Sequence, residues 1–161
     1  SLHMKTIQSI CLFTYLLFAG CSDQVPSGGG GHHVHTAPHG GELYELGPHG
    51  SGFNFELFLS ENGNLNLYVL DAHAENFVRI KQTQIEIIFP DSNRTSLSLE
   101  AIEDSATGET VGDSSRFQSP ESIHDLLPIQ GIIKEITVGS KTYSEQNISF
   151  SGNSKGNADE H

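Results

Sequence analysis

Hydrophobic and polar residues alternate along much of the chain beyond residue 41, which is the pattern of strands with one buried face. The alternation is clearest at 53–59 and 65–69, and the Glu-Asn-Gly stretch at 61–63 predicts a hairpin loop with Gly63 in a left-handed conformation. Such a loop puts the apolar side chains of both strands on one face. The predicted pairs are Leu59 with Leu65, Leu57 with Leu67 and Phe55 with Val69.

Short strand-like segments separated by turn residues continue to residue 150. Among them, Ser119 is a predicted N-cap and Pro120 a predicted first residue of a short helix that ends at Pro128. About eight short strands and one short helix indicate an all-β, antiparallel β-sandwich with an immunoglobulin-like outline. An open barrel is the alternative architecture. The remaining predicted strands are 84–89, 94–101, 116–118, 132–138 and 141–150.

The beginning of the chain has the composition of a bacterial export signal. We expect residues 1–3 to be a cloning remnant and residues 4–20, an apolar stretch after one lysine, to be a lipoprotein signal peptide too short to span a bilayer. The Phe-Ala-Gly-Cys sequence at 18–21 resembles the lipobox of bacterial lipoproteins, so Cys21 is the predicted lipidation site. An ordinary cleaved signal or a buried apolar helix is the alternative. Lipidation would anchor the protein in the cell envelope, facing the periplasm from the outer membrane.

Composition divides the rest of the chain into three parts. Residues 21–40 read as a flexible tether rich in Gly and His, residues 41–150 as the β-sandwich domain, and residues 151–161 as a disordered tail. The formal net charge is −12, with 20 acidic and 8 basic residues. Nucleic acid and anionic lipid surfaces need a basic face, so we expect neither as a partner, and the membrane contact should be the lipid anchor alone.

Histidines carry the clearest functional signal. The stretch from residue 32 to residue 50 holds five of the nine histidines in the chain, and Pro38-His39-Gly40 recurs as Pro48-His49-Gly50. Proline before each His and glycine after it predict turns that present an imidazole. Neutral imidazole is a common ligand for zinc and copper, so the arm before the domain is a candidate metal site. Its candidate ligands are His32, His33, His35 and His39.

A second candidate site follows from extending the predicted hairpin. That extension places His73 opposite Ser51 and brings His49 near Glu75. The predicted result is a mixed nitrogen and oxygen cluster suited to Cu(II) or Zn(II), made of His49, His73, Asp71 and Glu75. Cu(I) is less suited, because a chain that begins at Cys21 has no Met. The remaining downstream candidate, His124, is expected to be a surface or capping residue.

Two resemblances add to this reading. Segment 38–47, which opens with Pro-His-Gly-Gly, resembles a family of small, His-rich bacterial secreted proteins and lipoproteins, together with segments 55–57, 67–71, 114–117 and 139–143. The same opening segment is similar to the N-terminal "PHGG" part of periplasmic adaptor subunits of heavy-metal efflux pumps. These resemblances imply periplasmic metal handling, and the residue that they single out is His39.

We therefore expect an envelope lipoprotein that binds a divalent transition metal, Cu(II) or Zn(II), in metal buffering or as a partner of a metal-efflux system. The alternative is a β-sandwich protein-interaction module with no specific metal role. An enzyme is the least favoured class, because the sequence has no nucleophile elbow and no HExxH motif.

Overall fold

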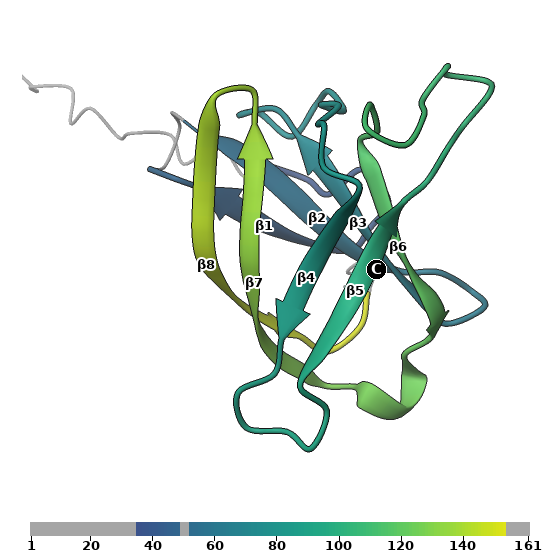
Figure 1. The fold of residues 1–161 in the computed structure, drawn as a ribbon, viewed down its shortest axis with the longest axis vertical. Coiled ribbons are helices and arrows are strands. Elements are labelled where there is room, and N and C mark those ends of the chain that lie inside the picture. The colour runs from purple at the N-terminus through teal and green to yellow at the C-terminus, as the bar shows by residue number, and fades with distance from the viewer. Residues whose placement is uncertain (1–34, 49–51, 154–161) are drawn as a thin grey trace, which may run out of the picture. The chain divides into compact units, whose positions relative to one another are not determined.

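The computed structural model describes residues 35–48 and 52–153, and this part of the chain is all-β (Figure 1). The predicted export signal lies outside the described residues, as do Cys21, His32, His33, His49 and the last eight residues. Among the described residues, no helix is long and apolar enough to cross a membrane. The eight strands in this part are β1 (Glu42–Leu46), β2 (Phe53–Leu59), β3 (Asn64–Leu70), β4 (Gln84–Ile88), β5 (Ser96–Ala101), β6 (Arg116–Ser122), β7 (Ile129–Val138) and β8 (Lys141–Phe150).

The strands form one antiparallel sheet in the order β1-β2-β3-β6-β5-β4-β7-β8 (Figure 1). The all-β antiparallel class predicted from the alternation is therefore confirmed. The sheet is continuous and nearly closes on itself, as in the open barrel that the sequence left as the alternative to a two-sheet sandwich. Its two edge strands approach each other where the Tyr44 hydroxyl of β1 donates a hydrogen bond to the Ser149 carbonyl of β8, at 2.9 Å.

The hairpin of β2 and β3 has the predicted register. Gly63 takes φ +85°, the left-handed conformation expected of the loop. The apolar side chains of this hairpin are buried in the core that the strands enclose, together with Phe117 of β6 and Phe150 of β8. The observed pairs are Leu59 with Leu65, Leu57 with Leu67 and Phe55 with Val69.

The helix predicted from Pro120 is shorter than expected. Residues 116–122 form β6, and only His124–Leu126 makes a single 3-10 turn. Ser119 does not act as an N-cap: its hydroxyl accepts a hydrogen bond from the Leu65 backbone N–H (3.0 Å) and donates one to the Glu121 carbonyl (2.7 Å). Ser119 thus connects β6 to β3 through a side-chain hydrogen bond.

The opposite face of β2, β3 and β6 carries the polar and aromatic residues of the alternation. Glu56 of β2 pairs with Tyr68 of β3, and Tyr68 pairs with Arg116 of β6. The residues just before β1 lie on this face, because His39 and Gly41 both make hydrogen bonds to Glu56. This face therefore positions His39.

Candidate functional site

Glu56 is a carboxylate buried in the middle of a strand, with no exposure to solvent. Its Oε1 atom accepts hydrogen bonds from the backbone N–H groups of His39 (2.9 Å) and Gly41 (2.8 Å). Its Oε2 atom lies 2.8 Å from Nδ1 of the His39 ring. Burial of a charged group is costly unless it is hydrogen-bonded, and these donors supply the partners. We name this arrangement the Glu56 clip.

The Pro38-His39-Gly40-Gly41 sequence folds into the turn that the clip requires. Gly40 takes φ +76°, and its backbone N–H bonds the Ala37 carbonyl at 3.1 Å. A Cβ atom on Gly41 would lie 2.2 Å from the Leu57 carbonyl oxygen, so only glycine permits this close approach to β2. The turn predicted from Pro-His-Gly is present, and the second glycine is needed for docking.

The His39 ring is held on its faces as well as at Nδ1. It stacks on Tyr68 with ring centroids 3.9 Å apart and lies 5.6 Å from Phe77, which is 49% exposed. Burial raises the pKa of Tyr68, while the nearby Arg116 guanidinium acts in the opposite direction. In a neutral imidazole, a proton on Nδ1 directed at this carboxylate leaves the lone pair on Nε2. Metal-binding histidines commonly have this orientation.

A second histidine contact joins the arm to the loop after β3. The rings of His35 and His73 have centroids 5.9 Å apart and are tilted by 58°. His35 is half-buried just before the clip, and His73 is exposed in the loop at 71–76. The structure therefore brings together one histidine from each of the two candidate sites identified in the sequence.

Asp71 shapes the loop that carries His73. Its Oδ1 atom accepts hydrogen bonds from the backbone N–H groups of His73 (3.2 Å) and Glu75 (2.9 Å), and its Oδ2 atom accepts one from the Asn76 amide (2.6 Å). Partial burial acts to raise the pKa of Asp71, but these hydrogen bonds, that of Asn76 foremost, lower it overall. Ala74 takes a left-handed φ of +57° in the same loop. Asp71 thus acts on the loop backbone.

The described residues contain no group of three or more His, Cys, Asp or Glu side chains placed to hold a metal ion. The full predicted clusters are therefore not assembled within 35–48 and 52–153, and the predicted ligands His32, His33 and His49 fall outside these ranges. His124 is exposed on the 3-10 turn, as expected of a surface residue.

Glu56 is the functional candidate that the sequence analysis missed. It stands between Phe55 and Leu57 in a strand whose outward positions are usually solvated. One signal was available: the correctly predicted register places Glu56 opposite Tyr68, with Phe58 two residues further along the same face. A carboxylate among aromatic side chains suggests a buried partner for a polar group elsewhere in the chain.

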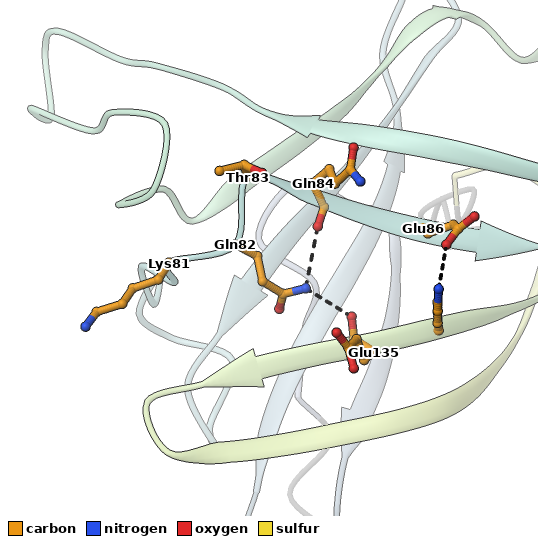
Figure 2. Close-up of a pocket in the computed structure, with 7 residues that line it drawn as sticks. Lys81, Gln82, Thr83, Gln84, Glu86 and Glu135 are labelled. Atoms are coloured by element: carbon orange, nitrogen blue, oxygen red, sulfur yellow. Dashed lines mark hydrogen bonds and ion pairs between the residues drawn. The ribbon is translucent and has the colours of Figure 1, made fainter.

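A polar pocket of about 390 Å³ lies between β4 and β7 (Figure 2). These strands pair only at Ile87 with Ile133 and Ile88 with Ile132, and beyond these pairs the Gln82 side chain spans the gap. Its amide nitrogen donates to the Glu135 carbonyl (3.3 Å), and its amide oxygen accepts from the Thr137 backbone N–H (2.6 Å). The side chain therefore replaces missing backbone pairing.

The fold and the site define an all-β antiparallel protein with a histidine-bearing arm clipped to its sheet. No family model, no curated protein and no solved structure matches the chain. The functional argument consequently depends on the residues themselves.

Proposed function

We propose that this protein is a lipoprotein of the bacterial envelope that binds a divalent transition metal, Cu(II) or Zn(II), through histidines, for metal buffering or supply to an efflux system. The observation that carries the proposal is the approach of His35 to His73, whose ring centroids are 5.9 Å apart. These residues are distant in sequence, so the fold gathers imidazoles from separate segments.

Other features support a cation as the ligand. Three of the four histidines among the described residues, His35, His39 and His73, lie on the arm or in the loop after β3. The net charge of −12 favours cations near the surface. His32 and His33, which precede His35 by three and two residues in the sequence, remain candidate additional ligands.

The second candidate function is a protein-interaction module with no specific metal role. Phe77 favours it, because this aromatic side chain is 49% exposed beside Tyr68 and His39. Aromatic residues are enriched at protein interfaces. Metal binding separates the two candidates.

Calorimetric titration of the full chain in detergent micelles with Cu(II) and Zn(II) tests the proposal. We expect saturable binding, weakened tenfold or more when His35, His39 and His73 are all changed to Ala. His124→Ala is the matched control, because His124 is exposed on the distant 3-10 turn. Binding no tighter than millimolar would reject metal binding and leave the interaction module. An equal loss in the control would reject His35, His39 and His73 as the specific ligands.

The envelope location has its own test. Cells that express the chain and grow with radiolabelled palmitate should yield labelled protein in the membrane fraction, and Cys21→Ser should abolish the label. Label that persists in this variant would contradict lipidation at Cys21.

A further inference from the structure

We infer that His35 and His73 chelate a single divalent transition-metal ion and thereby join the N-terminal arm to the loop after β3. The inference rests on the proposed function and specifies its site. Neither residue is part of the Glu56 clip, so this chelate is a separate feature of the arm.

The spacing of the two rings suits one shared ion. Zinc binds an imidazole nitrogen at about 2.0–2.1 Å, which puts the ring centroid about 3.2 Å from the metal. Two such rings at a tetrahedral angle would have centroids about 5.2 Å apart, and two rings on opposite sides of the ion about 6.4 Å apart. The observed separation of 5.9 Å lies between these limits. The 58° tilt also distinguishes this contact from a stacked pair such as His39 and Tyr68, at 19°.

Both ligands stand next to backbone that is already fixed. His35 lies four residues before His39, whose backbone N–H donates a hydrogen bond to Glu56 at 2.9 Å. In the loop, the His73 backbone N–H bonds Asp71 at 3.2 Å, and the Asn54 amide donates to the Asp71 carbonyl at 2.8 Å. Ligands held before binding lose less conformational entropy when the ion arrives. The chelate therefore needs little rearrangement.

The donor set indicates the class of ion. Imidazole nitrogen favours Cu(II), Ni(II) and Zn(II), whereas Mg²⁺ and Ca²⁺ prefer oxygen ligands. Two imidazoles leave further positions on a four-coordinate ion. His32 and His33, which precede His35 in the sequence, are candidate ligands for these positions.

The test is calorimetric titration of the full chain in detergent with ZnCl₂ and CuCl₂, for the parent, His35→Ala, His73→Ala and the double variant. We expect each single change to weaken binding tenfold or more, which is about 1.4 kcal/mol. The fold-loss of affinity in the double variant should be smaller than the product of the two single fold-losses, because both residues bind the same ion. NMR adds a direct readout: one equivalent of Zn(II) should shift the ring signals of His35 and His73 and leave those of His124 unchanged.

The outcomes separate the inference from the proposed function. If the parent binds metal but both single variants bind it equally well, the chelate is wrong and the proposed function stands on other histidines, which His32→Ala with His33→Ala would locate. If the parent shows no binding tighter than millimolar, both fail. Thermal unfolding without metal should be the same for all four proteins, since His35 is only half-buried and His73 is exposed.

Discussion

Nδ1 of His39 lies 2.8 Å from Oε2 of Glu56, a carboxylate with no exposed surface, and the backbone N–H of the same histidine bonds the other carboxylate oxygen at 2.9 Å. One side chain of β2 thus holds both the ring and the backbone of a residue 17 positions earlier. The conformation of the arm depends on this carboxylate.

Glu56→Gln should destabilise the protein by about 2 kcal/mol, because its single amide oxygen can accept from the backbone N–H groups of His39 and Gly41 only without the negative charge, and its NH₂ group replaces the oxygen that faces the His39 ring. Urea unfolding measures the change. Glu61→Gln, at an exposed position of the hairpin loop, should stay within about 0.5 kcal/mol of the parent. An equally small effect at Glu56 would show that the clip contributes little to stability.

The two glycines of the turn should respond differently to alanine. Gly41→Ala places a Cβ 2.2 Å from the Leu57 carbonyl oxygen and should cost about 2–3 kcal/mol in unfolding free energy. Gly40→Ala meets no atom within 4 Å, so only the left-handed φ of +76° opposes it, at about 1 kcal/mol. Thermal unfolding of both variants gives the order. A larger loss at Gly40 would contradict the close approach of the arm to β2.

Glu109 predicts a pH dependence of stability. Partial burial acts to raise the pKa of this carboxyl, but the hydroxyl and backbone N–H of Ser115, then Thr107 and Arg79, lower it overall. A lowered folded pKa means that its contribution is fully present above the unfolded value of about 4.3 and is lost as pH falls through the folded pKa. As the pH falls from about 5 to about 3, the urea midpoint of Glu109→Gln should therefore decrease less than that of the parent. Parallel curves would show that Glu109 does not contribute.

Gln82 should contribute to stability through the gap between β4 and β7. Gln82→Ala removes the partners of the Glu135 carbonyl and the Thr137 backbone N–H and should cost about 1–2 kcal/mol in chemical unfolding. Gln84→Ala is the control, because this exposed side chain accepts only a hydrogen bond from Ser98 at 3.2 Å in the described part of the chain. Equal effects of the two substitutions on the unfolding free energy would mean that the Gln82 hydrogen bonds to β7 do not stabilise the protein.

The sequence predicted local features of the fold better than distant ones. The hairpin of β2 and β3 was predicted to the residue, because a three-residue loop with Gly63 determines which apolar side chains face each other. The helix at Pro120 was overestimated, because Ser119 bonds the Leu65 backbone in a strand distant in sequence. Local capping patterns contain no information about such a partner.

In the candidate site, too, local features could be predicted from the sequence and long-range contacts could not. The Pro-His-Gly turn was predictable from its own residues, but its attachment to Glu56 depends on how β1 approaches β2. Likewise, the contact of His35 with His73 arises because the arm crosses the sheet near the loop after β3, and no spacing rule relates these two positions. Long-range packing brings these residues together.

The edges of the sheet affect whether copies of this protein associate at high concentration. Open strand edges invite pairing with a second chain, which leads to aggregation. Here the Tyr44 hydroxyl of β1 engages the Ser149 carbonyl on the edge of β8, and burial raises the pKa of this tyrosine, so it keeps the proton that it donates. Glu145 of β8 also takes a left-handed φ of +55°. We therefore expect the seam that nearly closes the sheet to hinder edge-to-edge assembly.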